Sequence, residues 1–220
     1  MSFNPQEFIP QHFIKIALDN KVLRFGEFTL KSGRVSPYFF NAGLLSTGEL
    51  LSSLANGYAD ALAKQADGKP LVIFGAAYKG IPFVAATAQA LWTNHGINAE
   101  WGYNRKEAKT HGEGGNLVGA DLAGKSVWVI DDVMTAGTAM REVVAILDGV
   151  GASVAGIIVA LDRKEKGQGD KSAIQELGES LNVPVLALVT MDDITDYVAK
   201  HGTSDELAKM NAYREQYGVN

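Results

Sequence analysis

The chain of 220 residues is long enough for one large α/β domain, or for a domain with a small appendage. Hydrophobic residues make up 46% and charged residues 20%, as in a globular protein with a proper core, and the net charge of −5 gives no support to a nucleic-acid partner. The absence of cysteine excludes disulfides, thiol nucleophiles and Cys-ligated metals. The N-terminal residues MSFNPQEF resemble no signal peptide, and no apolar run approaches the ~18 residues of a membrane span. We therefore expect a cytoplasmic protein that does not bind a membrane.

The first seventy residues alternate between helical and extended patterns. Apolar side chains at helical spacing predict an amphipathic helix over residues 5–19. The segment 22–30, VLRFGEFTL, predicts a strand, and a turn with two cations at 31–34 leads to an extended aromatic segment at 37–40. Residues 46–49, STGE, fit a capping box and predict the start of a second amphipathic helix.

From residue 71 the pattern becomes strand, loop and helix. The apolar run 71–74 predicts a strand, which a loop of small residues at 75–80 follows. Pro82 fits the first turn of a helix, and this helix should run to about His95. The segment 97–103, INAEWGY, predicts the next strand.

The segment 104–117, NRKEAKTHGEGGNL, has no apolar periodicity. It carries Arg105, Lys106, Lys109 and His111, and three glycines follow within four positions. A polar loop this long inside a compact domain is usually functional or disordered. We therefore expect a loop here that serves function.

Residues 119–126, GADLAGKS, match the Walker A pattern letter for letter. A phosphate-binding Walker A loop needs a strand before it and a helix after it. Here Lys125 and Ser126 run directly into the apolar strand 127–130, so no helix N-terminus is available for phosphates. We reject a P-loop NTPase and expect a turn.

The stretch 127–142, VWVIDDVMTAGTAMRE, joins a short buried strand to a pair of carboxylates. After Asp131 and Asp132, small and hydroxyl residues at 135–138 precede a helical pattern that ends near Val150. Ligands in open α/β sheets bind outside the carboxyl ends of strands, and helix N-termini attract anions, so this stretch suits a ribose 5-phosphate. Walker B segments, aspartyl-phosphate enzymes and metal sites also combine a strand with an acid, so that combination alone leaves those alternatives open.

The remaining chain continues the α/β pattern. A strand is predicted at 154–161, with a charged loop at 162–165, and a helix at 172–181 precedes a strand at 185–189. A C-terminal helical region follows. Strands separated by helices imply right-handed crossovers and a mostly parallel sheet.

The order of residues from Val127 to Ala139 resembles the phosphoribosyl pyrophosphate (PRPP) signature of the type I phosphoribosyltransferases. Within that family, FTLKSGR at 28–34, FFNAGL at 39–44 and the basic segment 104–117 resemble orotate phosphoribosyltransferases of the bacterial type. The resemblance covers nearly the whole chain.

The resemblance implies the type I phosphoribosyltransferase fold, an α/β fold with a mostly parallel central sheet flanked by helices. We expect a single domain over residues 1–220. It would comprise a small N-terminal hood at about 1–45, a core at about 46–190 and C-terminal helices at about 191–220. We also expect a homodimer in which the 104–117 loop reaches into the neighbouring subunit.

The implied reaction transfers ribose 5-phosphate from PRPP to orotate, giving orotidine 5′-monophosphate and pyrophosphate for de novo pyrimidine (UMP) synthesis. Mg²⁺ is the implied cofactor, held mainly by pyrophosphate and water, with no direct protein ligand assigned. A PRPP transferase for another base and a PRPP-sensing regulator without turnover are the alternatives. A degraded basic loop or an added DNA-binding segment would mark the regulator, and the sequence has neither.

The resemblance also implies a role for each site residue. The catalytic residues would be Lys109, Asp131 and Asp132. PRPP would be bound by Lys31, Tyr78, Lys79, Arg105, Lys106, Lys109, His111, Asp131, Asp132, Val133, Met134, Thr135, Ala136, Gly137, Thr138 and Ala139. Orotate would be bound by Lys31, Phe39, Phe40, Thr135 and Arg163.

Overall fold

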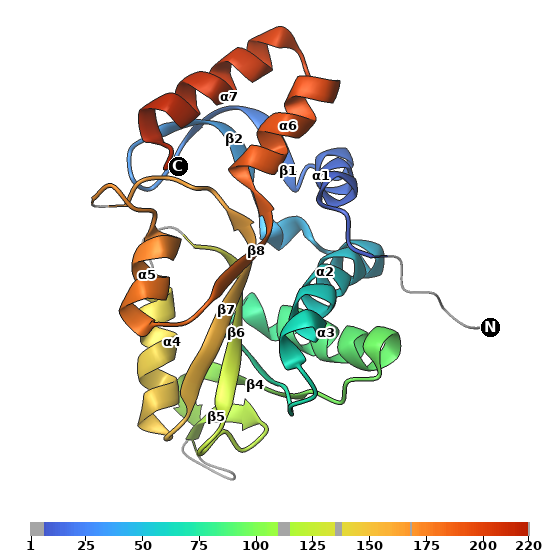
Figure 1. The fold of residues 1–220 in the computed structure, drawn as a ribbon, viewed down its shortest axis with the longest axis vertical. Helices are drawn as coiled ribbons and strands as arrows, with labels where there is room; N and C mark the ends of the chain where they lie inside the picture. Colours follow the sequence, from blue (N-terminus) through green and yellow to red (C-terminus); the bar gives the residue numbers. More distant parts are fainter. Residues whose placement is uncertain (1–6, 110–114, 135–137, 168, 220) are drawn as a thin grey trace, which may run out of the picture.

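The computed structural model describes residues 7–109, 115–134, 138–167 and 169–219, without the side chains of residues 107–109, 115 and 138 (Figure 1). A six-stranded sheet forms its centre, in the order β5-β4-β3-β6-β7-β8. All neighbouring strands are parallel except β4 and β5. The strands are β3 (Val72–Gly75), β4 (Glu100–Lys109), β5 (Gly115–Gly119), β6 (Ser126–Val133), β7 (Ser153–Asp162) and β8 (Val185–Thr190).

Helices cover both faces of this sheet (Figure 1). On one side lie α2 (Gly48–Ala66) and α3 (Gly80–His95), and on the other lie α4 (Thr138–Gly149) and α5 (Ala173–Leu181). The expected α/β fold, a mostly parallel sheet flanked by helices, is confirmed. No helix in the described part of the chain is both long and apolar enough to cross a membrane.

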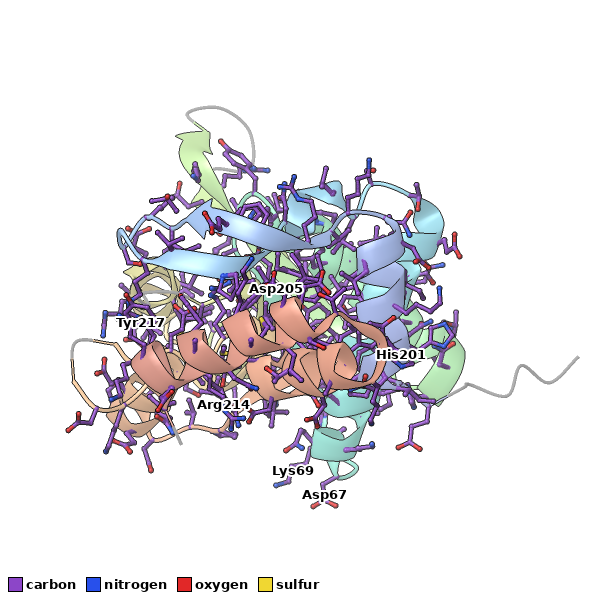
Figure 2. The ribbon with its side chains drawn as sticks, turned by 90° about the horizontal axis from the view of Figure 1, so that it is seen from above. Asp67, Lys69, His201, Asp205, Arg214 and Tyr217 are labelled. Atoms are coloured by element: carbon purple, nitrogen blue, oxygen red, sulfur yellow. The ribbon has the colours of Figure 1, made fainter. Side chains whose placement is uncertain are left out.

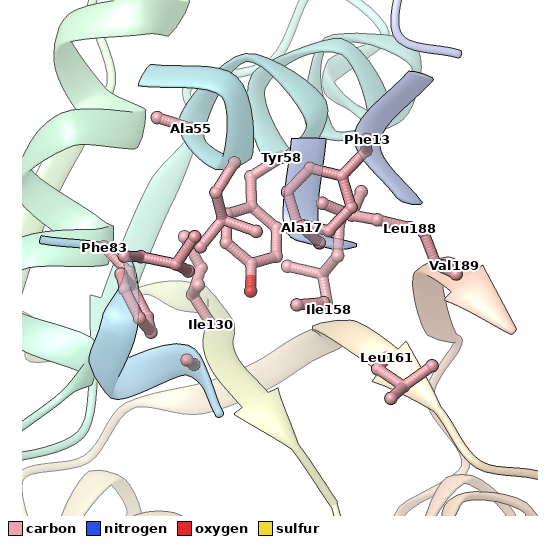
Figure 3. Packing of buried hydrophobic residues seen from close by; sticks show 14 of the residues in the cluster. Phe13, Ala17, Ala55, Tyr58, Phe83, Ile130, Ile158, Leu161, Leu188 and Val189 are labelled. Atoms are coloured by element: carbon pink, nitrogen blue, oxygen red, sulfur yellow. The ribbon is translucent and has the colours of Figure 1, made fainter. Parts of the chain in front are cut away.

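The central strand β6 is buried on both faces, as the apolar run VWVI predicts. Because side chains alternate along a strand, Val127 and Val129 belong to the core cluster that includes α4 and α5, whereas Trp128 and Ile130 belong to the cluster that includes α2 and α3. In the latter cluster Tyr58 of α2 points toward the sheet beside Ile130 (Figure 3). The strand that carries the candidate site is thus fixed by two separate cores.

The remaining elements lie at one end of the molecule (Figure 1). A two-stranded antiparallel hairpin lies there with three helices. These elements are α1 (Pro10–Asp19), β1 (Leu23–Thr29), β2 (Val35–Phe40), α6 (Met191–His201) and α7 (Ser204–Tyr217), with a short 3₁₀ helix at Ala42–Leu44. The helix expected at 5–19 is described from Pro10, whose missing N–H suits a first helical position.

The prediction of a long loop over residues 104–117 is wrong for most of that segment. Strand β4 continues to Lys109 and β5 begins at Gly115, and the two strands form an antiparallel arm. Sequence periodicity misses this arm because a β-ladder is held by backbone hydrogen bonds, which need no apolar alternation. Residues 110–114, including His111, lie outside the described residues.

The capping box expected at 46–49 does not form either. The N-cap of α2 is Thr47, whose hydroxyl accepts a hydrogen bond from the Leu50 N–H over 3.3 Å. Glu49 therefore stands one position too early to bond back to the N-cap backbone. It still places a negative charge in the first turn, where the helix dipole favours one.

Candidate active site

Two carboxylates stand side by side in the last residues of β6. Asp131 and Asp132 are both half-buried, and the Asp131 carboxylate accepts the backbone N–H of Asp132 over 2.8 Å. From α2, the Tyr58 hydroxyl donates to the Asp131 carbonyl over 2.8 Å. This bond fixes the backbone at the point where the strand leaves the sheet. No sequence pattern predicts this hydrogen bond, because Tyr58 has the spacing of one more apolar position of α2.

Burial and mutual repulsion govern the charge of this pair. Burial, together with the charge of Asp132, raises the pKa of Asp131 from 3.8 to about 6, against the opposing effect of Lys79. The Lys79 ammonium lies 2.7 Å from the Asp132 carboxylate, of which 14% is exposed. The pair therefore carries negative charge at neutral pH and attracts cations and hydroxyl donors.

Lys79 belongs to a tight loop between β3 and α3. This loop closes on itself through two glycines: a Cβ on Gly75 would lie 2.1 Å from the Gly80 carbonyl oxygen, so neither position has room for a side chain. The Asn104 side chain, buried at the base of the arm, accepts the Ala77 N–H over 2.9 Å. Asn104 thus positions the loop, a role that its place in a polar segment concealed.

The loop and the arm meet at Tyr78. Tyr78 is 65% exposed, and the Lys106 ammonium lies 5.0 Å from the centroid of its ring. A cation at this distance from an aromatic face is attracted to it. Cations from the loop and the arm of one chain, Lys79 and Lys106, are thereby brought to the carboxylate end of β6.

Several of the residues assigned to PRPP lie outside this description. These are His111, Thr135, Ala136 and Gly137, together with the side chains of Lys109 and Thr138. Of the described neighbours, Met134 is buried in a core cluster, so its backbone alone is available to a phosphate. Val133 is half-buried, and Ala139 is exposed in the first turn of α4.

A second group lies at the end of the adjacent strand. Val133 of β6 pairs with Leu161 of β7, so Arg163 emerges from the sheet beside the carboxylates. Arg163 is only 6% exposed, and its guanidinium lies 4.2 Å from the centroid of the Tyr38 ring. It donates to Glu165 and to Ser36 of the hairpin, each over 2.8 Å. Arg163 is therefore a buried, paired cation and not a solvated one.

The two phenylalanines assigned to orotate face opposite ways, because successive residues of a strand alternate. Phe40 packs on the core helix α1, where its ring lies 6.5 Å from that of Phe13. Phe39 stacks on Phe28 at 5.5 Å on the other face of the hairpin. Lys31 is exposed in the hairpin turn. The structure thus separates Phe39 from the face that carries Phe40.

The described residues contain no group of three or more His, Cys, Asp or Glu side chains arranged to hold a metal ion. Asp131 and Asp132 nevertheless offer hard oxygen acceptors of the kind that Mg²⁺ prefers beside substrate phosphates. The arrangement at the ends of β6 and β7 can therefore bind an anionic ligand through cations and its hydroxyl groups through carboxylates.

Known proteins resemble this chain along nearly its whole length. The family described as phosphoribosyl transferase domain matches residues 46–179. An orotate phosphoribosyltransferase from Acinetobacter baumannii is 63% identical, covering 98% of this chain and 99% of the relative. One from Saccharophagus degradans is 54% identical, covering 94% and 96%. The crystal structure of an orotate phosphoribosyltransferase from Francisella tularensis matches with a TM-score of 0.85 at 45% identity, covering 94% of this chain and 100% of that chain.

The raised pKa of Asp131 predicts that its carboxylate destabilises the fold at neutral pH. Between about pH 4 and 6 the native state holds a proton that the unfolded state lacks, so the free energy of unfolding falls as the pH rises through this range, and the destabilisation is complete above about pH 6. We expect Asp131→Asn to raise the free energy of unfolding by about 1–3 kcal/mol at pH 8, and by less as the pH approaches 4. Urea denaturation at both pH values measures this.

The matched control is Asp148→Asn, which changes an exposed aspartate on α4. It should show no difference between the two pH values. A loss of stability at pH 8 in Asp131→Asn, or an equal gain at both pH values, contradicts the assignment.

Proposed function

The chain belongs to the orotate phosphoribosyltransferases, and from that membership we propose how its residues divide the reaction between PRPP and orotate. The family that the sequence suggested is confirmed. The enzyme is a pentosyltransferase of pyrimidine biosynthesis that converts orotate and PRPP to orotidine 5′-monophosphate and pyrophosphate. The observation that carries this conclusion is 63% identity over 98% of the chain. The cytoplasm, as the compartment in which it works, remains a proposal.

We assign the ribose of PRPP to Asp131 and Asp132. Carboxylates accept strong hydrogen bonds from hydroxyl groups, and both of these are half-buried at a strand end. The segment from Val133 through Ala139, ending in the first turn of α4, is assigned to the 5′-phosphate. The N-terminus of α4 favours negative charge there, which supports this assignment.

We assign the pyrophosphate to the cations of the loop and the arm. As the bond between C1 of the ribose and the pyrophosphate oxygen breaks, positive charge builds on the ribose and negative charge on the leaving group. A ring nitrogen of orotate then forms the new bond to C1, and its N–H proton passes to the departing pyrophosphate or to water. No side-chain nucleophile is required, since placed charges in a site closed to water stabilise such a transition state. The candidate groups are Tyr78, Lys79, Arg105, Lys106, Lys109 and His111.

The cations of the loop and the arm also explain how an acidic protein would attract anionic substrates. The net charge of −5 repels PRPP and orotate at long range, so the cations must be concentrated where the substrates bind. Two contacts support this proposal. The Lys106 ammonium lies against the Tyr78 ring, and the Lys79 ammonium pairs with the Asp132 carboxylate. In the absence of PRPP the Lys79–Asp132 pair also neutralises part of the carboxylate charge.

We assign orotate to the region between the hairpin and the end of β7. Arg163 would bind the pyrimidine or its carboxylate, with Lys31 of the hairpin turn, Thr135, Phe39 and Phe40 as further candidates. The buried position of Arg163 supports this role, because a hydrogen bond to a charged group is stronger away from water. Phe40 shares a face of β2 with Ser36 and Tyr38, which both contact Arg163. Phe40 is therefore better supported than Phe39.

We propose that Mg²⁺ enters with PRPP, held mainly by pyrophosphate and water. When bound, it neutralises charge on the leaving group. Asp131 and Asp132 would accept hydrogen bonds from its water ligands as well as from the ribose, and we assign no direct protein ligand.

We also propose a homodimer with shared active sites. Trp92 of α3 is 60% exposed and Trp101 of β4 is 36% exposed, and large apolar side chains of this kind are typically covered at interfaces. Lys106 lies over Tyr78 of its own chain, so the crossing is assigned to the tip of the arm, with Lys109 and His111. Such a tip, polar and rich in glycine in its sequence, would close over an anionic ligand.

The function itself is tested by mixing the protein with PRPP, Mg²⁺ and orotate and following the orotate absorbance. We expect the absorbance to fall only when all three are present. Adenine, guanine or uracil in place of orotate should release no pyrophosphate. Turnover of one of these bases instead, or binding of PRPP without turnover of any base, contradicts the proposed reaction.

Changing both carboxylates, Asp131→Asn with Asp132→Asn, should nearly abolish transfer while the protein stays folded. Each carboxylate would lose a charge-assisted bond worth about 1.5–3 kcal/mol. Turnover is measured by the orotate assay, and circular dichroism checks the fold. With Asp148→Asn as the control, turnover within about twofold of the parent in the double variant shows that the pair does not bind ribose.

Arg163→Ala should raise the KM for orotate more than the KM for PRPP, because its proposed partner is the pyrimidine or its carboxylate. Steady-state kinetics with each substrate varied in turn separates the two. Lys125→Ala is a suitable control, since Lys125 pairs with Glu100 at the opposite end of the sheet. A larger effect on PRPP than on orotate refutes the assignment.

Lys109→Ala should lower the chemical rate more than substrate affinity. Its ammonium is proposed to meet charge that develops on pyrophosphate, an interaction strongest in the transition state. Removing one such donor typically lowers turnover by about 10²–10³. Single-turnover kinetics measures the chemical step, and a pure affinity defect with unchanged turnover excludes the role.

The shared site predicts complementation between two inactive variants, Lys109→Ala and the double carboxylate variant. A mixed dimer would carry one site with both defects and one with neither. After subunit exchange, activity should return to about a quarter of the parent's if mixing is statistical and the sites act independently. Mixed dimers seen by native mass spectrometry without activity would show that the arm serves its own subunit.

A further inference from the structure

The protein holds the guanidinium of Arg163 through its Nε and Nη2 groups. Its Nε donates to Glu165 Oε1 over 2.8 Å, and its Nη2 lies 2.6 Å from the same oxygen and 2.8 Å from Ser36 Oγ. The Tyr38 ring covers one face of the group. Within the described residues, Nη1 donates no hydrogen bond to the protein. The direction of Nη1 is thus set by the groups that hold Nε and Nη2.

Glu165, which holds that edge, is itself fixed from the C-terminal helix. The Tyr213 hydroxyl of α7 donates to Glu165 Oε1 over 2.8 Å. Burial, together with the neighbouring Glu165 charge, raises the pKa of Tyr213 to about 12, against the opposing effect of Arg163, which also interacts directly with this hydroxyl, so the hydroxyl stays protonated and remains a donor. The other carboxylate oxygen faces Arg34 of the hairpin turn at 3.6 Å.

The chain after β7 and the C-terminal segment are joined by backbone bonds as well. The Val219 N–H donates to the Lys164 carbonyl, and the Lys166 N–H donates to the Tyr217 carbonyl, each over 2.8 Å. Figure 2 shows α7, with Arg214 and Tyr217 labelled, running alongside the β1–β2 hairpin. Residues on either side of Glu165 therefore cannot move independently of α7.

We infer that α7 is a positioning element of the base site. The Tyr213 hydroxyl orients the Glu165 carboxylate, and Glu165 orients the Arg163 guanidinium so that Nη1 is directed at the anionic pyrimidine. This inference rests on the proposed contact between Arg163 and orotate. Tyr213 and Glu165 touch no substrate in this arrangement, so both act through Arg163.

The guanidinium of Arg163 is a rigid group. Its five N–H groups are fixed in a planar fork, so a carboxylate on the Nε–Nη2 edge sets the direction of Nη1. A carboxylate that loses its own donor is freer to rotate and holds the fork less well. Loss of the Tyr213 hydroxyl should therefore weaken the binding of orotate to Nη1 and leave the binding of PRPP at β6 unchanged.

The test compares Tyr213→Phe with Tyr217→Phe in the full-length enzyme. Both tyrosines lie on α7 one turn apart, and both substitutions keep the ring, but only the Tyr213 hydroxyl bonds to Glu165. Loss of one such hydrogen bond should raise the KM for orotate by about three- to tenfold in Tyr213→Phe. The KM for PRPP should stay within about twofold in both variants, and Tyr217→Phe should leave the KM for orotate unchanged within the same limit.

A second measurement distinguishes positioning from general stabilisation. In an Arg163→Ala background, Tyr213→Phe should cause no further rise in the KM for orotate, because its effect passes through the missing guanidinium. Equal effects of Tyr213→Phe and Tyr217→Phe, parallel losses for both substrates, or an additive effect without Arg163 would overturn the inference. If Arg163→Ala itself does not raise the KM for orotate, the proposed contact between Arg163 and orotate is wrong, and the positioning role of α7 is wrong with it.

Discussion

The carboxylates of Asp131 and Asp132 repel each other at the end of a strand whose apolar faces are fully covered. Burial, together with the neighbouring charge of Asp132, opposes ionisation, which is why the pKa of Asp131 rises to about 6. Three features of the fold stabilise this arrangement. Hydrophobic clusters pack against both faces of β6, the Tyr58 hydroxyl donates to the Asp131 carbonyl, and the Lys79 ammonium pairs with the Asp132 carboxylate. The fold thus maintains this pair of carboxylates against its electrostatic cost.

The loop that carries Lys79 shows how closely this support is packed. Gly75 and Gly80 approach each other so nearly that a methyl group at either position would clash with backbone atoms. Asn104 then fixes the loop from the neighbouring strand. Asn104 and Lys106 both belong to β4. The hydrogen bond from Ala77 to Asn104 therefore holds the loop against the same arm that carries Lys106.

Local patterns predicted the parts of this structure that are local. The apolar run VWVI predicts the central strand β6, and the helical pattern from about Thr138 predicts α4; both are confirmed. Contacts distant in sequence left no such signal: Ser36 meets Arg163 across 127 positions, and Tyr213 meets Glu165 across 48. The arm was missed for a related reason, since backbone pairing between β4 and β5 needs no side-chain pattern.

The two proposed substrate sites consequently come from different parts of the chain. The phosphoribosyl transferase domain match, residues 46–179, contains the carboxylates, the Lys79 loop and the arm. The groups around Arg163 come partly from outside that range, from the hairpin and from α7. Under the proposed assignments, the shared part of the chain binds the ribose phosphate, and the two ends of the chain adapt it to one base. A transferase for another base can then keep β6 and its carboxylates unchanged while differing in the hairpin and in the C-terminal helix.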